Sequence, residues 1–298
     1  MPKRRRQRPQ RDEQTLDLFP ELPLPPPPDD LVELKGIRPV WTEQKAKLIA
    51  RYLQLFTYVT KHGTYIDGFA GRQSPDAVDG WAAELVLNNQ PRWLRRFYLC
   101  DNSADQIAAL NELRDRQPAP IKRSDRREIE VLLGDFNQIV SELLATKRMD
   151  PATFCLLDQR TFECAWSTVT KLARHRSKGK IEIFYFLPIG WIDRAIHATK
   201  KSREQIEAWW DAADWRTLVD MKPHEKALAF RRKFLDLNYK YVLPFPICDH
   251  ANGDRIMFYM ILATDHSEAP KLMWRAFNRG VHDEAGWDQQ GLPGFDPS

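Results

Sequence analysis

The chain has 298 residues, of which 43% are hydrophobic and 29% charged, so disorder of the whole chain is excluded. We expect neither a membrane span nor a secretory signal, because no stretch approaches the roughly 20 consecutive apolar residues of a span and the first residues lack an apolar core. Four cysteines without a Cys-x-x-Cys pair argue against a disulfide framework or a zinc knuckle and favour a cytoplasmic protein. The net charge of +4 does not identify a nucleic-acid partner.

Residues 1–30 are expected to form a disordered tail outside the fold. Its first part is basic, with Lys3, Arg4, Arg5, Arg6, Arg8 and Arg11. The prolines at 25–28 follow, and because proline fixes φ and has no amide hydrogen, they predict an extended polyproline II segment. The tail is either an electrostatic arm for phosphate backbones or an acidic partner, or only a solubilising extension, and charge alone does not separate these.

Residues 31–280 show the pattern of a compact α/β domain. A helix is expected to begin at Trp41 with Thr42 as its N-cap, because apolar residues then recur at three- and four-residue spacing. Short apolar strands are predicted at 64–69, 97–100, 129–133, 154–157 and 181–187, and they alternate with helices at 80–88, 104–116, 139–144 and 166–175. This alternation is typical of a mostly parallel sheet flanked by helices.

The last third of the chain has a different pattern. A helical insertion is expected at about 200–238, followed by strands at 241–243 and 256–262 and a helix at 267–278. The turn at 249–254 contains Asn-Gly, so the two strands should form a hairpin that adds an antiparallel strand to the sheet. Residues 281–298 are expected to be a C-terminal tail.

Four aspartates fall at or just after predicted strand ends: Asp67, Asp101, Asp135 and Asp158. Each alone is typical of a turn or a helix cap, but the carboxyl ends of parallel strands form the ligand crevice of such sheets. Asp101 is placed to accept hydrogen bonds from ribose hydroxyls, as acids there do in dinucleotide folds. Asp135 could accept one from an adenine amino group, and Asp158 would face the substrate. The pattern predicts one nucleoside site.

The run from Tyr65 to Gly71, Tyr-Ile-Asp-Gly-Phe-Ala-Gly, resembles the first motif of class I S-adenosylmethionine-dependent methyltransferases. More narrowly, residues 32–280 resemble the three-Cys-motif partner family, TcmP. That resemblance also rests on Trp41 and Lys45, on the Asp158 loop followed by Trp166, and on the strand at 258–263. It implies a Rossmann-like class I methyltransferase-type fold, S-adenosylmethionine as cofactor and a partner protein that bears three cysteines. The cofactor-binding residues would be Asp67, Gly68, Phe69, Ala70, Gly71, Asp101 and Asp135.

Two departures from the family pattern put the activity in question. After Gly71 the family usually continues Pro-Gly, whereas this chain has Arg72-Gln73-Ser74-Pro75. The Asp158 loop usually reads Asp-Pro-Phe-Gly and here reads Asp-Gln-Arg-Thr. Loops that methylate a base nitrogen carry a stacking aromatic, for which only Phe162 is available, two positions late. Arg160 would put a positive charge beside a sulfonium, so the site binds an anionic group or no longer methylates.

Basic residues in the later helices are candidates for nucleic-acid binding. The candidates are Arg174, Lys178, Arg231, Arg232 and Lys233. Together with Trp209, Trp210 and Trp215 they could form a groove that follows a phosphate backbone and stacks bases. The other interpretation is that the tryptophans belong to the core and the charges to a solvated face.

Two functions from different classes therefore remain. The first is a methyltransferase that acts on or with RNA or DNA in concert with a partner, with Asp158 as the catalytic residue that orients the acceptor. The second is a catalytically degenerate subunit that serves as a binding or scaffold component of a protein or nucleoprotein complex. No metal site is expected, because the seven histidines form no His-x-x-x-His or Glu-x-x-His cluster.

Overall fold

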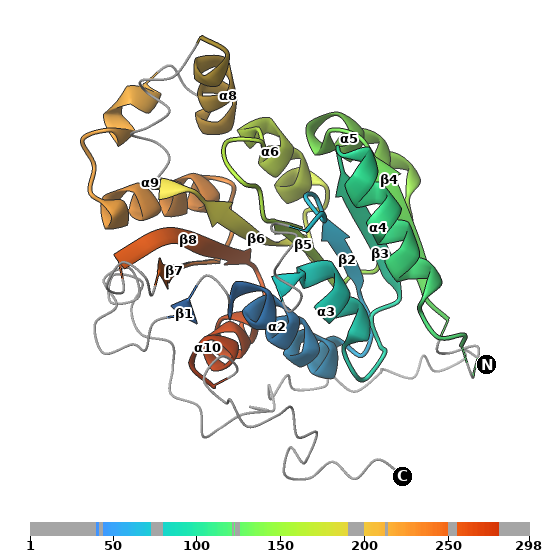
Figure 1. Cartoon of the computed structure of the whole chain (residues 1–298). Helices are drawn as coiled ribbons and strands as arrows, with labels where there is room; N and C mark the ends of the chain where they lie inside the picture. Colours follow the sequence, from blue (N-terminus) through green and yellow to red (C-terminus); the bar gives the residue numbers. More distant parts are fainter. Residues whose placement is uncertain are drawn as a thin grey trace, which may run out of the picture.

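The computed structural model describes residues 40–41, 44–72, 80–120, 122, 126–189, 200–211, 214–249 and 255–279. They form one eight-stranded sheet in the order β1-β7-β8-β6-β5-β2-β3-β4, with helices on both faces (Figure 1). The strands are β1 (Val40–Trp41), β2 (Thr64–Asp67), β3 (Arg96–Asp101), β4 (Glu128–Leu133), β5 (Thr153–Leu157), β6 (Glu182–Leu187), β7 (Tyr241–Asp249) and β8 (Arg255–Thr264). Both predicted tails and the Asn-Gly turn at 252–253 lie outside the described residues.

The sheet is mostly parallel, and the antiparallel strand near the C-terminus was predicted correctly. β8 pairs antiparallel with β6 and with β7, while the other pairs are parallel. From β2 the chain passes outward to β3 and β4 and then returns to β5 on the other side of β2. The strand order therefore reverses between β2 and β5, and the carboxyl ends of these strands are where such sheets bind ligands.

The helices form two layers, one on each face of the sheet. Their bounds are α2 (Lys45–Thr60), α3 (Ala82–Asn88), α4 (Ala104–Asp115), α5 (Phe136–Thr146), α6 (Trp166–Arg174), α8 (Lys200–Trp210), the 3-10 helix η4 (Trp215–Leu218), α9 (Pro223–Asp236) and α10 (Ala269–Arg279). One core lies between the sheet and α2, α3, α4 and α10, and the other between the sheet and α5, α6, α8 and α9. Successive residues of a strand alternate between the cores, as Tyr65 and Ile66 do, because strand side chains alternate across the sheet.

Several boundaries differ from the sequence expectations, and two of them have identifiable reasons. Trp41 does not begin a helix: it belongs to β1 and pairs with Cys248 of β7, so backbone pairing across the sheet sets its conformation. Helix α5 begins three residues earlier than the apolar spacing indicated, because Asp135 caps it by accepting a hydrogen bond from the backbone N–H of Asn137. Within the described part, no helix is long and apolar enough to cross a membrane.

Candidate functional site

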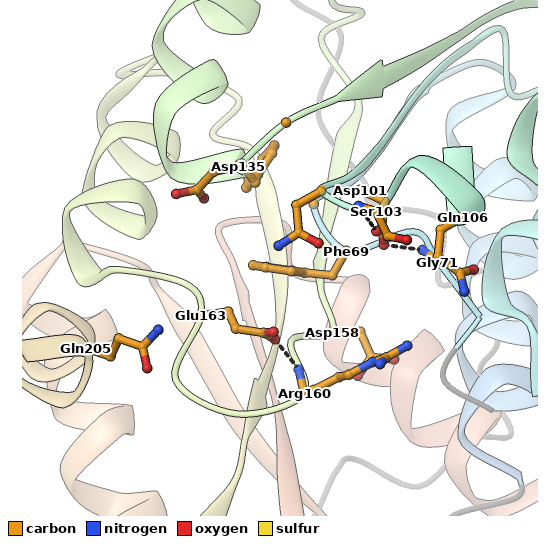
Figure 2. Close-up of a pocket in the computed structure, with 14 residues that line it drawn as sticks. Phe69, Gly71, Asp101, Ser103, Gln106, Asp135, Asp158, Arg160, Glu163 and Gln205 are labelled. Atoms are coloured by element: carbon orange, nitrogen blue, oxygen red, sulfur yellow. Dashed lines mark hydrogen bonds between the residues drawn. The ribbon is translucent and has the colours of Figure 1, made fainter. Parts of the chain in front are cut away.

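A cavity of about 300 Å³ opens at the carboxyl ends of β2 to β5, large enough for part of a small ligand. Figure 2 shows its walls, which come from the loops after these four strands and from α8. The lining residues are Gly68, Phe69, Gly71, Asp101, Asn102, Ser103, Gln106, Gly134, Asp135, Phe136, Asp158, Arg160, Glu163 and Gln205. The structure thus brings together three of the four strand-end aspartates.

Asp101, at the end of β3, is held in a fixed orientation by two backbone donors. The N–H of Gly71 donates to its Oδ2 and the N–H of Ser103 to its Oδ1, both at 2.9 Å (Figure 2). Residue 71 must be glycine for this contact, because a Cβ there would collide with the Asp101 carboxylate. The loop after β2 and the acid after β3 therefore form one unit, and each carboxylate oxygen keeps a second lone pair for a ligand.

An apolar wall lies beside these acids. A Cβ on Gly68 would lie 2.7 Å from the ring of Phe136, so the glycine lets the first turn of α5 approach the β2 loop. The rings of Phe69 and Phe136 pack edge to face, with their centroids 6.2 Å apart. Both residues line the cavity, which therefore combines an aromatic surface with carboxylates.

Asp135 lines the cavity while it caps α5. Its Oδ1 accepts from the backbone and the side-chain amide of Asn137, both at 2.9 Å. The Asn137 side chain also donates to the carbonyl of Glu163 at 2.7 Å and accepts from the N–H of Ala165 at 2.8 Å. This network connects the end of β4 to the loop after β5. Asp135 therefore acts as a helix cap, which is one of the roles that the sequence allowed for it.

Two residues expected to bind a cofactor, Asp67 and Ala70, lie behind the cavity and do not line it. Asp67 is buried and accepts from the Tyr65 hydroxyl at 2.8 Å and from the N–H of Phe69 at 3.2 Å. Burial raises the pKa of Asp67 to about 7. Ala70 is pinned by its N–H, which donates to the carbonyl of Cys100, and by its carbonyl, which accepts from the Trp81 indole, both at 2.7 Å. Both residues shape the loop that carries Gly68, Phe69 and Gly71.

Asp158 is paired with a lysine that sequence reasoning did not include among the site residues. Lys45 Nζ lies 2.8 Å from Asp158 Oδ1, and the two side chains are only 8% and 7% exposed. The same ammonium lies 5.1 and 5.3 Å from the ring centroids of Phe186 and Phe258. The sequence feature that could have identified Lys45 as a buried residue is its position one turn before Leu48 and Ile49, on the same face of α2.

The loop after Asp158 is held in place by Gln159, one of the residues that depart from the family pattern. Gln159 is fully buried, and it donates to the carbonyl of Phe186 at 3.0 Å and accepts from the N–H of Cys164 at 2.7 Å. Phe162 packs edge to face against Trp209, with centroids 4.8 Å apart. The idea that Phe162 stacks on a bound base is not supported by this position, because its ring fills the core.

Arg160 lines the cavity, as the sequence indicated. Its guanidinium donates to the carbonyl of Arg72 at 2.7 Å. Its backbone N–H donates to Glu163 Oε2 at 2.7 Å (Figure 2). The lining residues that sequence reasoning missed are Asn102, Ser103, Gln106, Gly134, Phe136, Glu163 and Gln205. Gln106 accepts from the N–H of Arg72 at 2.7 Å, and its place in the first turn of α4, after Asp101, was the available signal.

The cysteines lie in the core of the protein. The four cysteines are buried, and burial raises the pKa of the Cys100 thiol to about 12, so a thiolate nucleophile is not available there. Among the described residues, no group of three or more His, Cys, Asp or Glu side chains could hold a metal ion.

The basic residues proposed for nucleic-acid binding lie away from this cavity. Arg176, between Arg174 and Lys178, donates to the carbonyl of Asp150 and to Thr153 at the start of β5, which is the opposite edge of the sheet. Arg174 and Lys178 are exposed. Arg174 and Lys178 therefore lie at the edge of the sheet opposite the ligand site, because α6 runs back from the carboxyl end of β5 to its amino end.

Of the three α9 candidates for nucleic-acid binding, Arg231, Arg232 and Lys233, only Arg232 is exposed. Arg231 donates to the carbonyl of Val242 at 3.2 Å. Lys233 donates to the carbonyl of Trp210 at 2.6 Å and lies over the rings of Trp166 and Trp210. Burial lowers the pKa of Lys233. Trp209 and Trp215 are buried in the core, as the alternative interpretation proposed.

No protein-family model and no curated protein matches the sequence. Solved structures with a similar fold include the methyltransferase domain of bacterial CtHen1, at 10% identity over 74% of this chain and 97% of that chain, with a TM-score of 0.42. The O-methyltransferase from Bacillus cereus, solved in complex with SAH, is 12% identical over 72% of this chain and 80% of that chain, with a TM-score of 0.40. Likeness at this level carries no argument about the site. The strand order itself defines a Rossmann-like domain of the class I methyltransferase type.

Proposed function

We propose that the cavity binds S-adenosylmethionine and that the chain is a methyltransferase that uses it. The observation that carries the proposal is that three features line one cavity: Asp101 at the end of β3, Asp135 after β4, and the glycine loop after β2. Asp101 would accept hydrogen bonds from the ribose hydroxyls and Asp135 one from the adenine amino group. The rings of Phe69 and Phe136 would contact the adenine.

The charge of the cavity favours this ligand over a phosphate-bearing dinucleotide. Among the described residues that line it, Asp101, Asp135, Asp158 and Glu163 are acidic and Arg160 is basic. A sulfonium and an amino group are attracted to such a lining, whereas a pyrophosphate would be repelled by it. The contacts of Gly68 and Gly71 also fit, because each glycine lets an element that lines the cavity approach the loop.

Asp158 would orient the methyl acceptor. Its carboxylate lines the cavity, and the buried ammonium of Lys45 at 2.8 Å holds it in place. A carboxylate accepts hydrogen bonds from an acceptor amine or hydroxyl and so fixes the direction of its lone pair. When bound, S-adenosylmethionine would supply a methyl group from its sulfonium, with the neutral thioether as the leaving group, and the acceptor would release its proton to water.

The acceptor we propose is a nucleic acid, RNA or DNA, presented in concert with a partner protein. Arg160 supports an acceptor with a phosphate group, because its guanidinium lines the cavity that Asp158 also lines. The resemblance to the three-Cys-motif partner family supports the partner. The position of Phe162 against Trp209 argues against an acceptor base stacked on that ring.

The same position of Phe162 favours a second candidate, a catalytically degenerate subunit that binds the nucleoside ligand without transferring a methyl group. The loop retains Asp158 in the lining of the cavity, but Gln159 and Phe162 are buried. Phe162 is therefore not available to stack on an acceptor base. In this case the chain would be a binding or scaffold component of a protein or nucleoprotein complex.

Transfer of labelled methyl groups separates the two candidates. The full chain is incubated with methyl-labelled S-adenosylmethionine and total RNA or DNA, with and without proteins captured by the chain from its own cells, and Asp158→Asn is the matched control. Label in nucleic acid that depends on Asp158 supports the methyltransferase. Binding of the cofactor without any transfer supports the degenerate subunit and contradicts the enzyme.

A further inference from the structure

A second cavity of about 320 Å³ lies at the opposite edge of the sheet from the candidate site. It is formed by the end of α4 and the segment after it, by the segment before β3 and by the start of β4. Its lining residues are Arg92, Arg114, Gln117, Pro118, Ala119, Pro120, Arg126, Arg127 and Ile129. Arg126 and Arg127 directly precede β4, whose carboxyl end carries Asp135, so the length of the strand separates the two cavities.

The lining of this second cavity is strongly cationic. It includes four arginines, and none of the described residues that line it is acidic. Arg114 Nε lies 2.8 Å from Asp115 Oδ1, but that carboxylate is 68% exposed and faces water. Solvent screens such surface pairs strongly, so Asp115 neutralises little of the charge around the cavity.

Two of the four guanidinium groups, those of Arg92 and Arg127, are oriented by neutral acceptors. Arg92 donates to the carbonyl of Pro118 at 3.4 Å and to Gln117 Oε1 at 3.3 Å. Arg127 donates to the carbonyl of Leu87 at 2.5 Å, and its guanidinium lies 5.2 Å from the ring centroid of Phe97. These contacts fix the direction of the two side chains, and their acceptors are neutral, so they do not compensate the charge.

Buried donors close to the cavity still lack acceptors. Arg127 Nε and Arg95 Nη1 are buried and have no hydrogen-bond partner among the described residues. Burial, together with the charges of Arg92 and Arg95, lowers the pKa of Arg127 to about 9. Like charges held together in this way destabilise the fold, and a bound anion would relieve the repulsion and satisfy donors.

We propose that this cavity binds a phosphate group. Arginine is the side chain best suited to phosphate, because its planar guanidinium donates two parallel hydrogen bonds to a pair of oxygens. A group with more than one negative charge matches several guanidinium groups better than a single carboxylate does. The phosphate belongs either to a small free anion or to a polynucleotide backbone, and its recognition by the four arginines is the same.

Calorimetric titration of the full chain with pyrophosphate tests this proposal. The test variant is Arg92→Gln/Arg126→Gln, which removes two charges and leaves the more buried Arg127 in place. The matched control is Arg116→Gln, an exposed arginine at the end of α4 that does not line the cavity. Circular dichroism and thermal unfolding check that all three proteins fold.

The expected result is saturable binding to the unchanged chain and to Arg116→Gln, weakened about tenfold or more in the double variant by the loss of charged hydrogen bonds. A parallel titration with a single-stranded oligoribonucleotide identifies the source of the phosphate. A similar loss there points to a polynucleotide, and a loss confined to pyrophosphate points to a small anion. Absence of pyrophosphate binding, or equal affinity in all three proteins, overturns the proposal.

Discussion

Lys45 and Asp158 are 113 positions apart in the chain, yet their side chains form a buried ion pair at 2.8 Å beneath the candidate site. The first turn of α2 supplies the lysine and the end of β5 supplies the carboxylate. The rings of Phe186 and Phe258 lie against the ammonium. The pair therefore joins an N-terminal helix to the site and determines where the Asp158 carboxylate points.

Replacing Lys45 by Met should leave the Asp158 carboxylate buried without its partner. Removal of one member of a buried pair costs roughly 3–5 kcal/mol, so the free energy of unfolding in urea should fall by about that amount. The double variant Lys45→Met/Asp158→Asn should lose less, because both charges of the pair are removed. Equal urea midpoints for the unchanged chain and Lys45→Met would show that the pair contributes nothing.

Replacing Gly71 by Ala should displace the Asp101 carboxylate, because the new Cβ would collide with it. The hydrogen bond from the N–H of residue 71 should be lost, and with it the orientation of the carboxylate toward the ribose. We expect S-adenosylhomocysteine to bind more weakly by about 1.5–3 kcal/mol, the contribution of one charged hydrogen bond. Adding Asp101→Ala should cause little further loss, since the two residues act as one unit. Additive losses would contradict this coupling.

The stability of the fold should fall as the pH rises from about 4 to about 7. Burial raises the pKa of Asp67 to about 7, whereas in the unfolded chain it is about 4. Between these values the folded chain binds more protons than the unfolded chain, so its free energy of unfolding decreases by at most about 1.4 kcal/mol per pH unit for this group.

Asp67→Asn should flatten this pH dependence, measured as urea unfolding at a series of pH values. Burial raises the pKa of Glu182 to about 7 as well, so part of the dependence should persist in Asp67→Asn and disappear only when Glu182→Gln is added. An unchanged pH profile in Asp67→Asn would mean that Asp67 is ionised in the fold well below pH 7.

If the exposed basic residues Arg174, Lys178 and Arg232 contact a nucleic-acid backbone, their replacement by Ala should flatten the salt dependence of binding. Counterion release contributes about −0.7 to −0.9 to the log–log slope for each neutralised phosphate, so the three changes together should flatten it by up to roughly 2–3 units. The comparison is with Lys233→Met, which should lower stability instead, because Lys233 contacts Trp166 and Trp210. If the salt slope of binding is unchanged, the three residues do not contact the phosphate backbone and belong to a solvent-exposed face.

The sequence was most informative where structure is local. Strand ends follow from short apolar runs that stop at polar residues, which is why Asp101, Asp135 and Asp158 could be assigned to one edge. What depends on tertiary contacts could not be predicted: the partner of Asp158 lies in a distant helix, and Phe162 turns toward Trp209 because α8 covers that side. The direction of α6, which carries Arg174 to the opposite edge, follows from the parallel pairing of β5 and β6, because the connecting helix must return to the amino ends of the strands.

Binding of S-adenosylhomocysteine to the full chain, measured by calorimetry, tests most directly the central claim that the cavity holds this type of cofactor. We expect saturable binding with one molecule per chain, and a loss of about 1.5–3 kcal/mol in Asp101→Ala, since one charged hydrogen bond to the ribose is removed. Absence of binding to the unchanged chain at millimolar ligand, or equal affinity in Asp101→Ala, would contradict it.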